Sequence, residues 1–530
     1  MRFPFQASRV VFGPLFATVV LWTLPLLAEA PPRAEITIIN AQAHALSAAL
    51  RDFVPFAPGL PAPAANVIAL RKPGGNKPSK GRGGGSWTDP QLQTSYPSPS
   101  AAIPGLDFDG ISANGSIPPD TNLAVGGSQV VEIVNTEFAV YDKSSGAVTL
   151  GPAPIHTIFT SLGGMCAASD GGDPIVLYDR DQGRWLISQL EYNINFSSNL
   201  VCIAVSTSSN ATGSYNLYAF NFGQNLPDYP KFGVWTDAYY FSANMFRKAT
   251  SFIGARACAF DRQAMLNGSP AVGICFQGST GLYNLLPSDL DGTTAPPGGT
   301  PDFYLQFVSN ALDLYKFHVD FTTPNNSTFT GTTLAVGSFH EACGGGACIP
   351  QPDTNEQLDS LGDRLMYRLS YRKFDSYQSL LVNHSVQVSS SSNQTGIRWY
   401  EIRNPGGTPT VYQESTFSPD SGTYRWMGSI AQDKQGNMLL GYSASSAGLF
   451  PSIYYTGRLA GDPVNQLQSE KPFWFGSGSQ TTYNRWGDYS SMAVDPNDGC
   501  TFWFATEYLP ATGVFNWHTH VASAKFDSCQ

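Results

Sequence analysis

From about residue 105 to the C-terminus, the chain alternates short runs of β-branched and aromatic residues with tight polar turns. Residues 175–188, 428–442 and 491–504 each show an apolar run, a turn opened by Asp and closed by Gly, and a second apolar run. Asp hydrogen-bonds to its own backbone in such turns, and Gly accepts a positive φ. Because no helical period lasts three turns here, the pattern predicts an all-β fold.

The hairpin recurs along the chain. Weaker copies turn near Gly127, Asp237, Asn310 and Asp375, so turns lie at about residues 127, 181, 237, 310, 375, 435 and 497, with a mean spacing of about 62 residues. Most units add a second strand pair, such as 257–261 with 272–276. Four strands a unit make a propeller blade, so residues 105–530 predict a seven-bladed β-propeller with four antiparallel strands per blade. A strand at 106–110 is expected to pair with the last blade.

Two β-sandwich domains are the alternative architecture for so many short strands. Sandwich strands would not keep a super-period of about 60 residues, so the repeat favours the propeller.

The first 104 residues have a different texture. Residues 1–30 read as a signal peptide, with Arg2 and Arg9 before an apolar run and Ala28-Glu29-Ala30 as a cleavage site. A membrane anchor is the rival interpretation, which the prolines within the run disfavour. Residues 31–104 are rich in Pro, Gly and Ala and predict a flexible segment with one short helix at 41–53. The single basic cluster is read as a solvated linker; it comprises Arg71, Lys72, Lys77, Lys80 and Arg82.

Composition supports export. The chain has eight Cys, an even number, which in an exported protein favours disulfides. Strand pairing predicts Cys258–Cys275, a small ring Cys343–Cys348, a terminal tie Cys500–Cys529, and by elimination Cys166–Cys202. Only 13% of residues are charged and the net charge is −10, so nucleic acid is not an expected partner. No later stretch is apolar enough to span a membrane, and we expect a secreted, extracellular protein.

Several phrases resemble known proteins. They are PPDTN at 118–122, GDPIVLYD at 172–179, YPKFGVW at 229–235, RWGDYSS at 485–491 and CTFWF at 500–504. Over about 105–529 the chain resembles a family of secreted, largely uncharacterised β-propeller-like microbial proteins. The resemblance implies a propeller and export, and it carries no activity to transfer.

The strong catalytic and cofactor motifs are absent from the sequence. There is no Gly-x-Ser-x-Gly, P-loop, Cys-x-x-Cys or His-Glu-x-x-His sequence, and no cofactor is expected. His340 and Glu341 beside Cys343 and Cys348 have the residue types of a zinc site, but a small disulfide ring is the simpler interpretation. His518 and His520 share one strand face, because alternate residues of a strand do. That geometry can bind a metal, but two His on a polar strand face are more often solvated or packed.

The residues that open each unit carry the best functional signal. In a propeller the innermost strands start near one mouth of the central channel, so residues just before them converge. Here these residues are Asp120, Asp173, Tyr229 with Lys231, Asp302, Asp363 with Arg364, Arg425, and Arg485 with Asp488. The structural alternative is that Arg and Asp pair across neighbouring blades and hold the ring closed.

These positions lead to a functional hypothesis. Asp120 and Asp173 would act as acid and base on a glycan, with Tyr229 or Lys231 assisting. Three arginines on one arc (Arg364, Arg425 and Arg485, with Asp488 beside them) would bind a carboxylate or sulfate, which favours acidic polysaccharide and a hydrolase or lyase. The alternatives are a non-catalytic carbohydrate-binding or adhesion propeller at the cell surface and, with less support, a peptidase.

Overall fold

The computed structural model describes residues 1, 35–52, 66–67, 71–73, 86–96 and 100–530, of which those within Glu35–Gln530 form one compact unit. The predicted signal peptide and Lys77, Lys80 and Arg82 of the basic cluster lie outside the described residues. Within the described part of the chain, no helix has the length and apolar character needed to cross a membrane.

The described strands form seven consecutive units of four, and neighbouring strands within each unit pair antiparallel. The first three units are β5 (Asn122–Val125), β6 (Gln129–Val134), β7 (Glu137–Asp142) and β8 (Val148–Pro154); β9 (Ile175–Asp179), β10 (Arg184–Tyr192), β11 (Asn199–Ser206) and β12 (Tyr215–Asn221); and β13 (Asn225–Val234), β14 (Ala238–Arg247), β15 (Ser251–Asp261) and β16 (Val272–Gln277).

The other four units complete the series. They are β17 (Leu286–Asp291), β18 (Asp302–Val308), β19 (Ala311–His318) and β20 (Thr328–Ala335); β23 (Met366–Lys373), β24 (Gln378–Ser389), β25 (Ser392–Arg403) and β26 (Thr410–Phe417); β27 (Tyr424–Gln432), β28 (Met438–Ser446), β29 (Leu449–Arg458) and β30 (Lys471–Trp474); and β31 (Ser491–Val494), β32 (Phe502–Tyr508), β33 (His518–Phe526) and β3 (Ala102–Ser112).

Further described elements lie outside these units. They are the eleven-residue strand β1 (Ile36–Leu46), the short strands β2 (Asn66–Val67), β4 (Ser116–Ile117), β21 (Ala347–Ile349) and β22 (Leu358–Asp359), and the α-helix α1 (Arg262–Leu266). The 3-10 turns are η1 (Leu50–Asp52), η2 (Ile155–Phe159), η3 (Met165–Ala167), η4 (Pro324–Asn326) and η5 (Ala342–Gly344).

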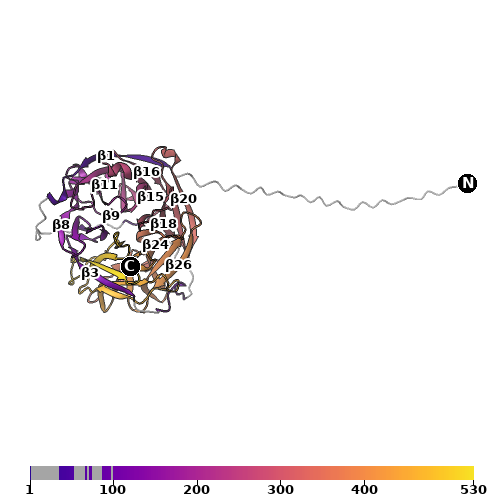
Figure 1. The fold of residues 1–530 in the computed structure, drawn as a ribbon. Helices are drawn as coiled ribbons and strands as arrows, with labels where there is room; N and C mark the ends of the chain where they lie inside the picture. The colour runs from indigo at the N-terminus through magenta and orange to yellow at the C-terminus, as the bar shows by residue number, and fades with distance from the viewer. Residues whose placement is uncertain (2–34, 53–65, 68–70, 74–85, 97–99) are drawn as a thin grey trace. The chain divides into compact units, whose positions relative to one another are not determined.

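The first strands of the units contact one another in a closed cycle. The order is β5, β9, β13, β17, β23, β27 and β31, and β31 contacts β5 again. β17 and β23 even pair in parallel, with Ser288 opposite Leu369. The predicted strand at 106–110 lies within β3, which pairs with β33 beside the C-terminal strands (Figure 1). Such a succession of four-stranded antiparallel units is typical of a β-propeller, and the predicted all-β fold is confirmed.

The seven predicted turns all lie between paired antiparallel strands. Six of them join the first two strands of a unit. The turn at Asn310 instead joins the second and third strands, β18 and β19, because a Gly- and Pro-rich loop separates β17 from β18. The prediction that Asp302 opens this unit is therefore wrong, since Asp302 begins its second strand.

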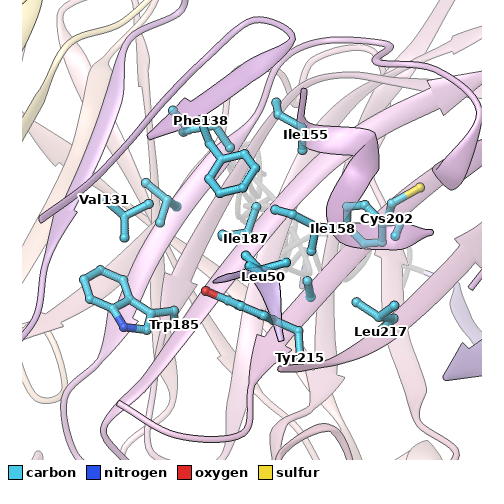
Figure 2. Close-up of a cluster of buried hydrophobic side chains, with 14 of the residues drawn as sticks. Leu50, Val131, Phe138, Ile155, Ile158, Trp185, Ile187, Cys202, Tyr215 and Leu217 are labelled. Atoms are coloured by element: carbon cyan, nitrogen blue, oxygen red, sulfur yellow. The ribbon is translucent and has the colours of Figure 1, made fainter. Parts of the chain in front are cut away.

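Apolar side chains fill the space between adjacent units. Between the first two units, Val131, Phe138, Ile187 and Trp185 pack together, and Leu50 from the N-terminal segment inserts among them (Figure 2). Leu50 is fully buried. Truncating such a side chain typically costs about 2–5 kcal/mol of stability, so this part of the N-terminal segment belongs to the core.

The helix predicted at 41–53 is wrong. Residues 36–46 form β1, which pairs with β16 along its first half and with β12 along its second half, and so joins two units into one nine-stranded sheet. Ala41, Ala43 and Ala45 are half-buried and alternate with the exposed Gln42, His44 and Leu46, which is the period of a strand. The edges of β12 and β16 each offer backbone hydrogen bonds to this segment, and this pairing outweighs the local helix propensity of its alanines.

The predicted disulfide framework is confirmed. Cys166–Cys202, Cys258–Cys275, Cys343–Cys348 and Cys500–Cys529 are all bonded. Cys258 and Cys275 lie directly opposite each other on β15 and β16, as the strand pairing predicted. Because Cys343 and Cys348 are bonded to each other, neither thiol is free to bind zinc.

Candidate functional site

Nearly every first strand has a residue with left-handed backbone just before it or at a register shift within it. Among the described residues, four such non-glycine residues precede the strand, Asp120, Asp173, Asn284 and Asp488, and two lie at a register shift, Tyr229 and Met427, with φ between 47° and 57°. Such conformations are costly for residues other than Gly and concentrate at functional sites. Because the first strands share one direction around the cycle, these residues gather at one end of it, here called the mouth.

Eight side chains form an axial cluster at the mouth. Its members are Asp120, Asp173, Tyr229, Lys231, Arg364, Arg485, Asp488 and Tyr489. The Lys231 ammonium lies 3.5 Å from the ring centre of Tyr229 and 3.8 Å from that of Tyr489. Seven of these eight residues were singled out from the sequence, and Tyr489 was not.

Lys231 is held between two aromatic rings with no exposure to solvent. Its ammonium donates a hydrogen bond to the Pro230 carbonyl at 2.9 Å. Burial lowers the pKa of Lys231 to about 7, against the carboxylates of Asp173 and Asp120, which raise it. A cation between two aromatic faces is stabilised by the ring quadrupoles, and a lysine with this pKa can exchange a proton near neutral pH.

The three carboxyl groups of the axial cluster differ in their hydrogen bonds. Asp173 accepts the Tyr229 backbone N–H at 2.9 Å, and its own N–H donates to the Asn135 side chain. Asp488 pairs with Arg485. Both Asp120 oxygens are buried without a hydrogen-bond partner in the described structure. Burial, followed by the charges of Asp488 and Asp173, raises the pKa of Asp120 well above its usual value.

The Asp120→Asn variant is expected to be more stable than the parent at pH 8, with the difference shrinking toward pH 4. Because the folded-state pKa of Asp120 is raised, ionisation opposes folding above the unfolded value of about 3.9. Below that value both states carry the neutral acid, which Asn resembles. Urea unfolding at several pH values measures the effect, and a pH-independent difference would contradict it.

Two of the three predicted arginines reach the mouth. Arg364 stacks over the Tyr229 ring at 4.4 Å and pairs with Asp363, with Nε 2.8 Å from Oδ1. Arg485 pairs with Asp488 three residues later. Both ion pairs lie within one unit, so neither joins neighbouring units.

Arg425 does not join the others, and its predicted place on the same arc is wrong. Its guanidinium is fully buried against Asp420 and Glu470, each at 2.5 Å. The pairing of β27 with β28 shifts register between Trp426 and Ser429, and Met427 takes the left-handed position at the mouth. The bulge moves the equivalent position by two residues, and turn spacing alone does not reveal it.

Asp228 is a site residue that the sequence reasoning missed. It precedes Tyr229 at a register shift in β13, and Arg71 of the N-terminal segment pairs with it at 2.9 Å. Burial, and then the charge of Asp173, raise the pKa of Asp228 to about 7 although Arg71 lowers it. The adjoining Tyr229-Pro-Lys231 phrase was the available signal. The solvated-linker interpretation of Arg71 is wrong, because a buried carboxylate attracts it.

Comparison with known proteins adds likeness of fold only. No family model matches the chain, and no curated protein does. The structure is similar to the Penicillium chrysogenum alpha-L-arabinanase complexed with arabinobiose (10% identity, 84% of this chain and 100% of that chain, TM-score 0.36). It is also similar to the Hadza microbial sialidase Hz136 (11% identity, 78% of this chain and 66% of that chain, TM-score 0.36). Identities and TM-scores this low carry no conclusion about activity.

Proposed function

We propose that the chain is a secreted seven-bladed β-propeller that acts on extracellular glycans at the mouth. One observation carries the proposal: carboxyl groups with raised pKa, Asp173 and Asp228, come from adjacent units and meet beside the Lys231, Tyr229 and Tyr489 cage. Four disulfides support folding in an oxidising compartment.

The pair has the acid–base character that glycoside hydrolysis requires. Asp228, with a pKa of about 7, keeps a proton near neutral pH and would protonate the leaving oxygen. Burial raises the pKa of Asp173, and the charge of Lys231 opposes that rise; Asp173 would serve as the base of the pair. Asp120, which the sequence suggested as acid or base, is fully buried and would instead tune the proton affinity of Asp173, with which it interacts electrostatically.

Contacts between units account for part of the axial cluster. Asp173 accepts the Tyr229 N–H of the next unit, and Arg364 stacks over the Tyr229 ring of another unit. Neighbouring units are also joined by ion pairs elsewhere: Asp179 with Arg262, Lys143 with Asp495, and Arg368 with Asp289 and Asp291. We infer that the carboxyl groups at the mouth serve chemistry in addition to these contacts.

The preference for acidic polysaccharide has weaker support than the site itself. It depended on three arginines, and Arg425 lies outside the axial cluster. Arg364 and Arg485 each already hold a carboxylate. We therefore expect neutral polymers to be used at least as well as acidic ones.

The test is product release from a panel that includes arabinan as a neutral polymer and polygalacturonan as an acidic one. Reducing ends report hydrolysis, and absorbance of unsaturated products reports a lyase. Asp228→Asn and Asp173→Asn are expected to lower kcat by at least about 100-fold, the usual contribution of a general acid or base. Asp375→Asn, in the exposed β23–β24 turn, is the matched control.

Two outcomes would overturn the proposal. Full activity in both carboxyl variants would exclude these residues as the acid and base. Retention of a polymer in pull-down without product release would instead support the non-catalytic carbohydrate-binding alternative, which the burial of Asp120 and Lys231 favours.

A further inference from the structure

A short N-terminal stretch lies at the mouth. β2 pairs in parallel with β4, and β4 leads directly to Asp120. Four residues after β2, Arg71 donates a hydrogen bond from Nη1 to Asp228 Oδ1 at 2.9 Å. The next residue, Lys72, donates to the Gly345 carbonyl in the Cys343–Cys348 ring. Two consecutive basic side chains thus bind groups from two different parts of the mouth.

The Arg71 guanidinium lies between a carboxylate and an aromatic ring, which are the groups that recognise cations. Its central carbon lies 5.9 Å from the ring centre of Phe196, and Phe196 stacks on Tyr192 at 4.9 Å. A carboxylate on one side and an aromatic face on the other stabilise a guanidinium by a charge-assisted hydrogen bond and a cation–π contact. The side chains of Arg71 and Asp228 are only 22% and 12% exposed.

The carboxylate and the ring are positioned without Arg71. Asp228 belongs to β13, which pairs with β14 on both sides of the register shift, and Tyr192 ends β10. Phe196 lies in the β10–β11 turn, where its N–H donates to the Asn193 carbonyl. Among the described residues, Arg71 is the one whose side chain donates a hydrogen bond to the Asp228 carboxylate. Arg71 therefore fills a preformed site in the way that a ligand does.

Lys72 extends the same pattern. Burial raises the pKa of Asp363, and Arg364 followed by Lys72 outweigh it and lower that pKa. Lys72 also lowers the pKa of Glu341, although burial and the charge of Asp363 raise it to about 7 overall. The acidic groups around the mouth are thus partly neutralised by a segment that lies more than a hundred residues away in sequence.

We propose that Arg71 is an internal ligand of the mouth, and that the Asp228 carboxylate and the Phe196 ring that hold it can bind a cationic or hydrogen-bond-donating group of an external ligand in its place. The external ligand and Arg71 compete for the same carboxylate. The inference rests on the proposed site at Asp228 and narrows its ligand to neutral or amine-bearing glycans, since a polyanion would meet several carboxylates there.

Chemical rescue tests occupancy directly. In the full-length Arg71→Ala variant, methylguanidinium is expected to bind and to shift the titration of the Asp228 carboxyl, followed by NMR. The double variant Arg71→Ala/Asp228→Asn is expected not to bind it. Arg51→Ala, which removes an exposed arginine of the same N-terminal segment, is the matched control and is expected to behave as the parent. Absence of binding to Arg71→Ala, or equal binding to the double variant, would overturn the proposal.

Turnover separates this inference from the proposed function. If Arg71 occupies the site about nine-tenths of the time, its removal should raise kcat/KM for a neutral or amino-sugar polymer by roughly tenfold. Rescue that depends on Asp228 without turnover of any polymer supports the internal ligand and counts against the glycan enzyme. Turnover by the parent that Arg71→Ala leaves unchanged, with no methylguanidinium binding, supports the enzyme and overturns the internal ligand.

Discussion

Removal of residues 1–47 is expected to destabilise the protein strongly, whereas removal of residues 1–34 is expected to leave its stability nearly unchanged. The difference between the two truncated chains is β1. Its residues pair with β16 from Ile36 to Asn40 and with β12 from Ala41 to Leu46. Loss of the strand leaves two sheet edges without partners at positions that the fold otherwise covers.

The expected loss is several kcal/mol, because each backbone hydrogen bond of such a ladder contributes about 0.5–1.5 kcal/mol. At an unfolding entropy of about 2.1 cal/mol/K per residue, a chain of this size shifts its Tm by only about 1 °C for each kcal/mol, so we expect the Tm to fall by several °C. Differential scanning calorimetry of the two truncated chains gives the measurement. Coincident transitions would show that β1 is dispensable, as a flexible N-terminal segment would be.

Turn chemistry made the repeat predictable. Asp and Gly at fixed places, as at Asp433 and Gly436, fix a hairpin locally: the Asp433 carboxylate accepts the N–H groups of Gln435 and Asn437, and Gly436 has φ 87°. The disulfide between Cys258 and Cys275 followed from the same local pairing. Features that depend on neighbours in sequence were therefore accessible.

Features that depend on residues far away in the sequence could not be predicted from it. β1 is a strand because β12 and β16, about 180 and 240 residues later, leave edges for it. Arg71 resembles any linker arginine until Asp228 is placed beside it. Asp120, Asp173 and Asp488, singled out from unit boundaries, lie together in the structure, and their functional role stays a prediction. The predicted placement was wrong at Arg425, where a β-bulge shifts the register.

The ion pairs between units also could not be predicted from the sequence. One of them lies where the first strands of two units meet. Arg368 on β23 donates to Asp289 at 2.7 Å and to both oxygens of Asp291 at 2.9 and 2.6 Å, and its Nε donates to the Met492 carbonyl on β31. Asp289 and Asp291 belong to β17, which pairs with β23 in parallel. One buried guanidinium thus binds two units and contacts a third.

Arg368→Ala is expected to destabilise the protein by about 3–5 kcal/mol, because it leaves two carboxylates buried without their cation. Burial already raises the pKa of Asp289, and Arg368 opposes that rise, so the variant's Asp289 should ionise at still higher pH. A raised folded-state pKa means that stability falls as pH rises above the unfolded value of about 3.9. The defect should therefore be larger at pH 8 than at pH 5 in urea unfolding.

Two further variants decide whether charge is the cause. Arg368→Met with Asp289→Asn and Asp291→Asn removes the charges together and is expected to recover most of the stability, since replacing a whole buried ion pair is often neutral. Arg247→Ala, at the exposed end of β14, should change stability by no more than about 0.5 kcal/mol. If Arg368→Ala unfolds at the parent's urea concentration at both pH values, the junction of β17 and β23 is held by backbone pairing alone. The Arg368 guanidinium would then contribute nothing to the free energy of unfolding.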